Sequence, residues 1–361
     1  MTNNIKSLAT YSLLGKSGLR VSPLALGTMT FGTEWGWGVD AKSANALIGA
    51  YLDAGGNFID TADGYTGGTS ESIIGNFLAE TGRRDRVVLA SKFSFAASPG
   101  DPNSGGNSRK NIYRALEGSL KRLKTDYLDL YWLHAWDGLT PVEEVMQTLT
   151  DLVRAGKIRY IGLSDVPAWY FARAQTLADQ RGLERVAALQ LEYSLVERNI
   201  EREHIPAAIE LGAGVTPWSP LASGMLTGKY RRDAAGNGRL DVVKGQGNPA
   251  FLKLFTDRNW AIVDELVGVA KELGKPAAQV ALAWVARRPG VTSTIVGATK
   301  PDQLDANLRA LELDIPAPLA ARLEAASRPE LVHPYIFFQP AMRGMLTAGT
   351  PVVAEWPTYR G

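Results

Sequence analysis

The chain has 361 residues and no cysteine, which excludes disulfides and thiolate chemistry. Its 39 lysine and arginine residues nearly balance 37 aspartate and glutamate residues, so charge gives no reason to expect a nucleic-acid or membrane partner. The first residues lack the apolar core of a signal peptide, and no apolar run approaches the ~18 residues of a membrane span, so a cytoplasmic protein is expected.

Short apolar runs alternate with amphipathic segments along nearly the whole chain. Residues 11–14 and 19–21 flank a glycine-bounded turn, which predicts an N-terminal β-hairpin. Eight further runs predict strands at residues 23–27, 57–60, 86–92, 127–135, 158–164, 185–193, 213–219 and 291–297. Helical patterns between them imply parallel strands. We therefore predict an α/β fold, a single (βα)8 TIM barrel domain over residues 1–361, with a doubly wound open sheet as the alternative.

Capping residues mark the ends of two of these helices. Residues 141–155 carry apolar side chains at helical spacing, and Thr140 is predicted to cap that helix. Ser108 is predicted to cap the helix that follows the third barrel strand.

Two insertions interrupt the alternation of strands and helices. A glycine-rich, basic loop at about residues 222–255 precedes an extra helix at about 257–273. After about residue 328 the tail is aromatic and is expected to be irregular. Loops this long in a compact domain are usually functional or disordered.

Ionisable side chains stand at the ends of three consecutive predicted strands. Asp60 ends the second strand, Lys92 the third and His134 the fourth, and Tyr65 lies in the loop after Asp60. Because the active site of such a barrel lies at the carboxyl ends of its strands, these side chains are predicted to share one mouth. Taken alone, each has a structural interpretation: the aspartate as a turn cap, the lysine as a solvated loop residue, the histidine as a core residue and the tyrosine as rim packing.

Together the four groups form a plausible proton donor and acceptor. A free phenol has a pKa of about 10, and a nearby ammonium lowers that pKa. A carboxylate keeps a buried ammonium charged, and a histidine can share the proton. We predict that Lys92 depresses the pKa of Tyr65 and that Asp60 is the counter-ion of Lys92.

Seven motifs together resemble the aldo-keto reductase superfamily over nearly the whole chain. They are DTADGY (60–65), SKF (91–93), LDLYWLHAWD (128–137), IGLSDV (161–166), LQLEYSL (189–195), TPWSPLASGMLTGKY (216–230) and IVGATKPDQLDANL (295–308). The last two are most similar to the branches that include potassium-channel β subunits and bacterial aldo-keto reductases. The resemblance implies an NADP-dependent carbonyl reductase or alcohol dehydrogenase without a metal, in which Tyr65 is the general acid and His134 orients the carbonyl.

The resemblance also implies a set of cofactor-binding residues. Ser164 and Gln190 match positions that hold the nicotinamide carboxamide, whereas Asp165 replaces the usual asparagine and can accept but not donate a hydrogen bond. Lys300, at the start of the last barrel helix, favours the 2′-phosphate of NADP over NAD. In chain order the implied residues are Gly27, Thr28, Met29, Asp60, Ser164, Asp165, Gln190, Trp218, Ser219, Pro220, Leu221, Gly224, Lys229, Arg239, Gly297, Thr299, Lys300, Gln303 and Asn307.

Aromatic residues are the predicted walls of the substrate pocket. Such walls suit an aldehyde or ketone with an apolar or cyclic body. The tail aromatics Tyr335, Phe337 and Phe338 either join these walls or pack on the barrel base. The predicted wall residues are Trp35, Trp37, Tyr65, His134 and Trp136.

Two other functions compete with a small-molecule oxidoreductase. The first is an NADPH-binding regulatory subunit with little turnover, which would need a protein partner. The second is a metal-dependent barrel hydrolase, which fits poorly because the predicted strand ends lack a histidine–carboxylate cluster. The sequence leaves oligomerisation open.

Overall fold

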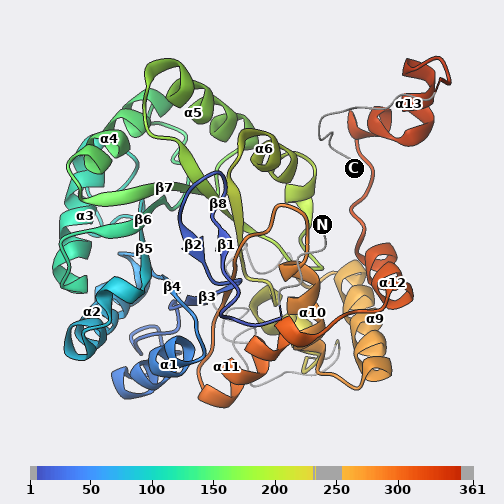
Figure 1. Cartoon of the computed structure of the whole chain (residues 1–361), viewed down its shortest axis with the longest axis horizontal. Helices are drawn as coiled ribbons and strands as arrows, with labels where there is room; N and C mark the ends of the chain where they lie inside the picture. Colours follow the sequence, from blue (N-terminus) through green and yellow to red (C-terminus); the bar gives the residue numbers. More distant parts are fainter. Residues whose placement is uncertain (1–5, 231, 233–253, 351–361) are drawn as a thin grey trace.

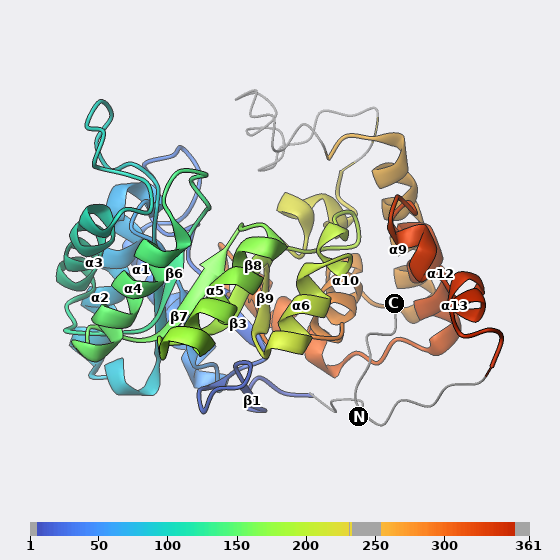
Figure 2. The ribbon, with the colours of Figure 1, turned by 90° about the horizontal axis from the view of Figure 1, so that it is seen from above.

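The computed structural model describes residues 6–230, 232 and 254–350 of the chain. Its first element is the predicted hairpin, in which β1 (Ser12–Leu13) pairs antiparallel with β2 (Arg20–Val21). The hairpin lies at one end of the barrel and closes its base (Figures 1 and 2).

Eight parallel strands form the barrel wall and confirm the predicted TIM barrel. They neighbour one another in the order β10-β3-β4-β5-β6-β7-β8-β9, and a parallel bridge between Val215 and Val291 brings the two edges together. The strands are β3 (Leu24–Gly27), β4 (Phe58–Asp60), β5 (Val88–Phe93), β6 (Leu128–Leu133), β7 (Ile158–Ser164), β8 (Val186–Glu192), β9 (Gly214–Trp218) and β10 (Thr294–Val296).

Helices alternate with these strands and cover the outside of the barrel (Figure 1). The barrel helices are α1 (Ala41–Asp53), α2 (Thr69–Thr81), α3 (Arg109–Leu123), α4 (Val142–Arg154), α5 (Ala168–Arg181), α6 (His204–Leu211), α10 (Ala277–Ala286) and α11 (Pro301–Leu308). The additional helices are α9 (Asp257–Leu273), which confirms the predicted extra helix, α12 (Ala317–Ser327) and α13 (Pro340–Leu346). Short 3-10 turns are η1 (Tyr65–Gly68), η2 (Arg84–Arg86), η3 (Asn199–Glu201), η4 (Ala222–Thr227), η5 (Arg309–Glu312) and η6 (Tyr335–Phe338).

One predicted helix cap is confirmed and the other is wrong. The Ser108 side chain accepts a hydrogen bond from the Asn111 backbone N–H and caps α3. The Thr140 hydroxyl instead donates to Asp137 Oδ2 at 2.6 Å, and Pro141 is the N-cap of α4 without a side-chain bond. The helix begins at Val142, one residue later than predicted, so Thr140 lies one residue before the cap position.

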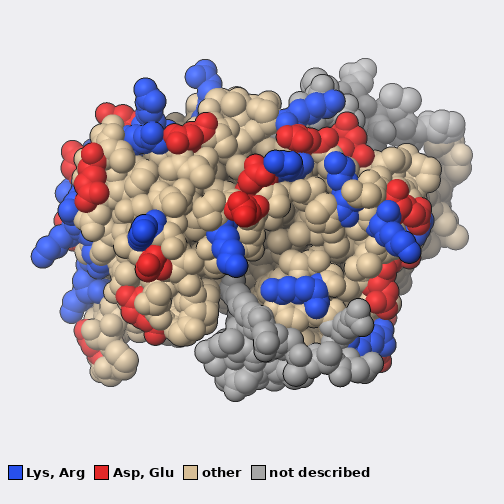
Figure 3. Space-filling view, turned by 90° about the horizontal axis from the view of Figure 1, so that it is seen from below, with Lys and Arg blue, Asp and Glu red and all other residues tan. Residues whose placement is uncertain are grey.

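The tail is partly helical, and the charges on the surface are mixed in sign. The tail after residue 328 is less irregular than expected, because it forms η6 and α13. On the face shown in Figure 3, lysine and arginine side chains are interspersed with acidic ones, without a large patch of one sign. In the described residues, no helix combines the length and the apolar character that crossing a bilayer requires.

A glycine leaves room for an aromatic ring on the neighbouring barrel strand. Gly162 on β7 pairs with Trp132 on β6, and a Cβ atom at residue 162 would overlap the Trp132 ring. Trp132 is fully buried, so neither the ring nor the strands can move aside without cost.

Gly162→Ala is therefore expected to lower the free energy of unfolding by about 1–3 kcal/mol through overpacking. Urea unfolding of the wild type and of Gly162→Ala measures this change. Gly18→Ala is the matched control, because a Cβ there meets nothing within 4 Å. Equal midpoints for the two variants would show that the Trp132 ring adapts freely.

Candidate active site

The mouth of the barrel brings together the four ionisable residues predicted from the strand ends. Asp60 is the last residue of β4, Lys92 lies near the end of β5 and His134 follows β6 directly. Tyr65 begins the 3-10 turn η1 in the loop after β4. Parallel registration places Asp60 beside Ala90 across the β4–β5 pair, so the neighbouring strands deliver their terminal side chains to one place.

A buried ion pair lies at the centre of this group. Lys92 Nζ is 2.5 Å from Asp60 Oδ2, and both side chains are excluded from solvent. The same ammonium donates to the Thr61 carbonyl at 2.9 Å, while Asp60 Oδ1 accepts from Gln190 Nε2 at 2.9 Å. Asp60 is thus a counter-ion rather than a turn cap, because both carboxylate oxygens are occupied by side chains of other strands.

The third hydrogen bond of Lys92 reaches the Tyr65 hydroxyl at 3.1 Å. Burial alone would lower the pKa of Lys92, but Asp60 and Tyr65 outweigh burial and the pKa is raised, so the ammonium stays charged.

The pKa of Tyr65 corrects one expectation. Burial raises this pKa above the usual value of tyrosine, and the lowering effect of Lys92 only partly offsets it. Lys92 lowers the pKa of Tyr65, as predicted, but desolvation of the phenolate raises this pKa by more.

His134 is neutral and is held by aromatic contacts. Burial lowers its pKa well below the usual range, and the Lys92 ammonium lowers it further. The ring packs edge-on against Tyr65, with ring centroids 5.9 Å apart, and against Phe95 at 4.7 Å. Because the buried Nδ1 atom has no hydrogen-bond partner in the structure, these rings rather than a polar contact set the orientation of the imidazole.

The turn after β3 lies against the same site. Thr28 donates from both its backbone N–H and its hydroxyl to the Asp60 carbonyl, at 3.0 and 2.9 Å. A Cβ at Gly27 would come within 2.5 Å of Ile295 Cγ2, so only glycine lets β3 and β10 approach this closely. Met29 follows and is half-buried.

The residues predicted to hold the nicotinamide also gather at the mouth. Ser164 ends β7, and its buried hydroxyl has no hydrogen-bond partner in the structure. Asp165 lies next to it with a positive φ of 46°, and its Oδ1 accepts from Trp218 Nε1 at 3.1 Å. Gln190 donates to Asp60 and so contacts the ion pair.

The loop after β9 has an unusual backbone. Ser219, Ala222 and Ser223 all have positive φ values, between 48° and 56°, and Gly224 follows at 99°. Non-glycine residues in this region cost on the order of 1–3 kcal/mol each and are concentrated at functional sites. Pro220 and Leu221 complete this loop.

Two basic residues farther along the same loop, Lys229 and Arg239, were predicted to bind the cofactor, and the structure describes the first of them. Lys229 is exposed, and its ammonium lies 4.9 Å from the centre of the Tyr230 ring. Arg239 lies outside the described residues.

Helix α11 begins with an exposed polar N-terminus. Lys300 is its N-cap and makes no side-chain capping bond. Thr299 and Gln303 are exposed and bonded to each other, with Thr299 N–H donating to Gln303 Oε1 at 2.9 Å. Asn307 is buried and donates to the Gly297 carbonyl at 3.4 Å.

Aromatic side chains form the rim of the mouth. The rings of Trp35 and Trp37 are 5.5 Å apart, and Trp35 lies 6.4 Å from Tyr65. On the other side Trp136 packs perpendicular to Trp169 at 5.5 Å. Neither Trp169 nor Phe95 was predicted from the sequence, although each lies within a few residues of a strand end, where such residues can be sought.

The tail aromatics do not join this rim in the structure. The Tyr335 hydroxyl donates to Glu203 Oε1 at 2.6 Å, and its ring contacts Phe338. Phe337 packs against His333. Glu203 is the N-cap of α6, so the tail packs against the connection between β8 and α6 at the carboxyl end of the strands.

A half-buried carboxyl group that the sequence did not single out lies in the loop between Asp60 and Tyr65. Burial raises the pKa of Asp63 to about 7, and repulsion from Glu71 contributes. Glu71 is fully buried and binds Ser91 at 2.5 Å and Arg122 at 2.6 Å. Asp63 Oδ1 has no hydrogen-bond partner in the structure.

The stability of the Asp63→Asn variant, relative to that of the wild type, should therefore increase as pH rises. Folded Asp63 holds its proton to higher pH than the unfolded chain does, so its contribution to stability falls between about pH 4 and pH 7. Asparagine does not titrate. Between pH 5.5 and 8 the free energy of unfolding of the variant should gain about 2 kcal/mol on that of the wild type, measured by urea unfolding. A difference that stays constant with pH would refute the raised pKa.

Comparison with known proteins identifies the family. The sequence profile of the Aldo/keto reductase family matches residues 23–328. The chain belongs to the Aldo/keto reductase family. It is 41% identical over 318 residues to the uncharacterized oxidoreductase YrpG of Bacillus subtilis, which covers 84% of this chain and 92% of the relative.

Two further relatives show the range of this family. A probable voltage-gated potassium channel subunit beta of Oryza sativa is 40% identical, over 84% of this chain and 91% of its own. An aryl-alcohol dehydrogenase [NADP(+)] of Phanerodontia chrysosporium is 36% identical, over 82% of this chain and 80% of its own. This aldo-keto reductase is thus an oxidoreductase similar both to enzymes and to proteins named as channel subunits.

Proposed function

We propose that this aldo-keto reductase interconverts aldehydes or ketones and their alcohols with NADP(H), with Tyr65 as the general acid. The observation that carries the proposal is the arrangement in which Asp60 holds Lys92 and Lys92 donates to the Tyr65 hydroxyl, at 2.5 and 3.1 Å. The charged lysine stabilises the phenolate that remains when Tyr65 gives up its proton. His134 lies beside the hydroxyl and is neutral, so it would orient a carbonyl through a hydrogen bond.

The residues at the mouth fit a dinucleotide. The buried Ser164 hydroxyl lacks a partner, as expected of a group that binds a ligand amide. The exposed N-terminus of α11 presents backbone N–H groups, which suit phosphates. Lys300 at that N-terminus supports NADP over NAD, as does the name of the P. chrysosporium relative.

When bound, the nicotinamide would supply the hydride to the carbonyl carbon. The residues of the chain would place the carbonyl oxygen near Tyr65 and His134, where negative charge develops and where stabilisation is most effective. The Trp218 ring, fixed by its bond to Asp165, supports the cofactor face of the site.

The substrate is proposed to carry an aromatic or other cyclic body. Trp35 lies beside Tyr65 and packs against Trp37, while Phe95 packs against His134, so these rings offer apolar walls near the site. Trp136 is two residues after His134 and is exposed. The name of the aryl-alcohol dehydrogenase relative agrees with that chemistry.

The test is the loss of NADPH absorbance with a panel of aromatic aldehydes and ketones, repeated with NADH. Turnover with NADPH and a lower kcat/KM with NADH are expected. Turnover that prefers NADH would overturn the cofactor assignment, and no turnover with any carbonyl would overturn the reaction.

A regulatory subunit that binds NADPH is the second candidate, favoured by the 40% identity to a protein named as a channel subunit. It predicts tight NADPH binding without turnover, together with capture of a protein partner. Fluorescence titration with NADPH and affinity capture from lysate, run beside the kinetic assay, separate the two functions.

A further inference from the structure

The backbone that follows Tyr65 is strained over three consecutive residues. Thr66, Gly67 and Gly68 have positive φ values of 48°, 65° and 97°, and α2 begins directly after them. The two glycines adopt this conformation at little cost, whereas a β-branched residue rarely adopts it. Strain of this kind persists only where the surrounding contacts impose it. The contacts of the support segment, residues 66–71, therefore decide where the Tyr65 hydroxyl lies.

Two hydroxyl groups fasten the support segment to the turn after β3. The Thr66 hydroxyl is buried, donates to the Phe31 carbonyl at 2.7 Å and accepts from the Ser70 backbone N–H at 3.2 Å. The Ser70 hydroxyl in turn donates to the Thr28 carbonyl at 2.9 Å. Since Thr28 also binds the Asp60 carbonyl, the support segment is fixed relative to the ion pair at the mouth.

A buried carboxylate joins the support segment to the strand that carries the lysine. Glu71, in the first turn of α2, is fully buried. Its Oε1 accepts from the Ser91 hydroxyl at 2.5 Å, and its Oε2 accepts from Arg122 Nε on α3 at 2.6 Å. Ser91 directly precedes Lys92 on β5, and the two side chains point to opposite faces of the strand. Glu71 therefore links the segment after Tyr65 to β5 and to α3.

The Arg122 side chain also lies against the strained residues. A Cβ atom at Gly68 would come within 2.7 Å of Arg122 Cδ and 2.8 Å of Nε, so the arginine fills the space on that side of the segment. Farther along α2, a Cβ at Gly75 would come within 2.4 Å of the Arg122 carbonyl oxygen. The two helices thus pack closely here, and the support segment is bounded by α3 as well as by the turn after β3.

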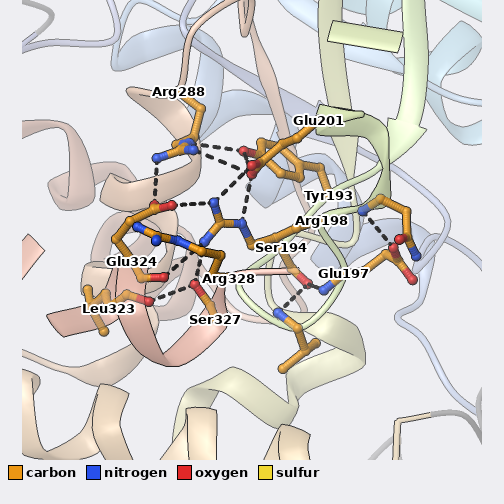
Figure 4. A network of polar contacts seen from close by, with 12 residues as sticks. Tyr193, Ser194, Glu197, Arg198, Glu201, Arg288, Leu323, Glu324, Ser327 and Arg328 are labelled. Carbon is orange, nitrogen blue, oxygen red and sulfur yellow. Dashed lines mark hydrogen bonds and ion pairs between the residues drawn. The ribbon is translucent and has the colours of Figure 1, made fainter. Parts of the chain in front are cut away.

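A second network of buried charges in the chain provides a comparison (Figure 4). Arg198, which is 3% exposed, donates to Glu324 Oε1 and to Ser327 Oγ, each at 2.7 Å. Arg288 donates to Glu324 at 3.0 Å. This network fixes α12 to the loop after β8, and none of the residues labelled in Figure 4 belongs to the ionisable group at the mouth or to the support segment. It has the same chemistry as the pair of Glu71 but a different place in the fold.

We propose that Glu71, together with Arg122 and Thr66, positions the Tyr65 hydroxyl against the Lys92 ammonium. The distance of 3.1 Å between these two groups depends on two supports, the segment after Tyr65 and strand β5. Glu71 is bonded across both supports, so its loss frees one relative to the other, and a hydrogen bond weakens steeply as its geometry departs from the optimum. Glu71 is a positioning residue, because it acts through Tyr65 and Lys92. The effect on rate rests on the proposed function.

Two variants of Thr66 test the position of the phenol. Thr66→Val keeps the shape of the side chain but removes both of its hydrogen bonds, whereas Thr66→Ser keeps them. Thr66→Val is expected to lower kcat for carbonyl reduction about 10- to 10²-fold, because a small displacement of a reacting group is costly. The KM for the carbonyl and the Kd for NADPH should change little, and Thr66→Ser should restore kcat. A wild-type kcat in Thr66→Val, or a serine variant as slow as the valine variant, would overturn the proposal.

The carboxylate is tested by Glu71→Gln. Glutamine keeps the size of the side chain but removes its charge and replaces one acceptor oxygen by a donor. The kcat should fall by a similar factor, again with little change in the Kd for NADPH. Glu324→Gln is the matched control, since Glu324 also accepts from arginines of two other segments, and it should keep the wild-type kcat. Equal losses of kcat in the two variants would show general destabilisation and refute positioning by Glu71. If Glu71→Gln does not fold, the Thr66 pair decides.

Hydrogen exchange, followed by mass spectrometry, tests the support segment without reference to activity. The peptide that contains Tyr65 and residues 66–71 should exchange faster in Glu71→Gln and Thr66→Val than in the wild type. It should exchange at the wild-type rate in Thr66→Ser and Glu324→Gln. A wild-type rate in Glu71→Gln would show that the carboxylate does not hold the segment, which contradicts the proposal. If the wild type reduces no carbonyl, the proposed reaction fails, and the exchange rates still decide whether Glu71 holds the segment.

Discussion

Tyr65→Phe is expected to lower kcat for carbonyl reduction by about 10²- to 10⁴-fold, because the phenol is the group that would protonate the carbonyl oxygen. Stability should change by only about 1 kcal/mol, the value of one hydrogen bond. Lys92 keeps its bonds to Asp60 and to the Thr61 carbonyl, so no buried charge is left without a partner. NADPH affinity, measured by fluorescence titration, should be nearly unchanged.

The control for this variant is a tyrosine outside the site. Tyr127→Phe removes a hydroxyl that donates to Asp85 Oδ1 at 3.3 Å ahead of β6, at the opposite end of that strand from His134, and should leave kcat close to wild type. If Tyr65→Phe retains full turnover, the proton comes from another group. If it loses NADPH binding together with turnover, Tyr65 has a role in binding and the assignment as an acid fails.

The sequence was sufficient to predict the barrel because its signals are local. Apolar runs bounded by turns and amphipathic helices repeat along the chain, and the polar residues at strand ends stand out against them. Parallel pairing then makes neighbouring strand ends meet, which is why Asp60, Lys92 and His134 could be placed together before any distance was known.

Features that depend on long-range contacts could not be read in the same way. The Thr140 hydroxyl donates to Asp137 instead of capping α4, and the pKa of Asp63 depends on its burial and on Glu71 in the following helix. The net pKa of Tyr65 depends on how completely the barrel excludes water, which no motif encodes. The direction of the tail depends on contacts such as Arg198 to Ser327, between residues far apart in sequence.

Lys92→Met is expected to be the most damaging single change at the mouth. It removes the partner of Asp60 and leaves a carboxylate that is 2% exposed with the Gln190 amide as its remaining side-chain donor. Breaking a buried ion pair from one side typically costs about 3–5 kcal/mol, and urea unfolding should show a loss of that size. Turnover should fall as well, because the Tyr65 phenolate loses the charge that stabilises it.

The double variant Asp60→Asn/Lys92→Met separates the two effects. With both charges removed, the desolvation cost disappears, so the double variant should be more stable than Lys92→Met alone while its turnover stays low. Lys157→Met provides the matched surface control. Its pair with Glu117, at 3.6 Å, is largely exposed, and the change should be within about 1 kcal/mol. If Lys92→Met is no more destabilising than Lys157→Met, water reaches Asp60 in solution. In that case burial could not be what raises the Tyr65 pKa.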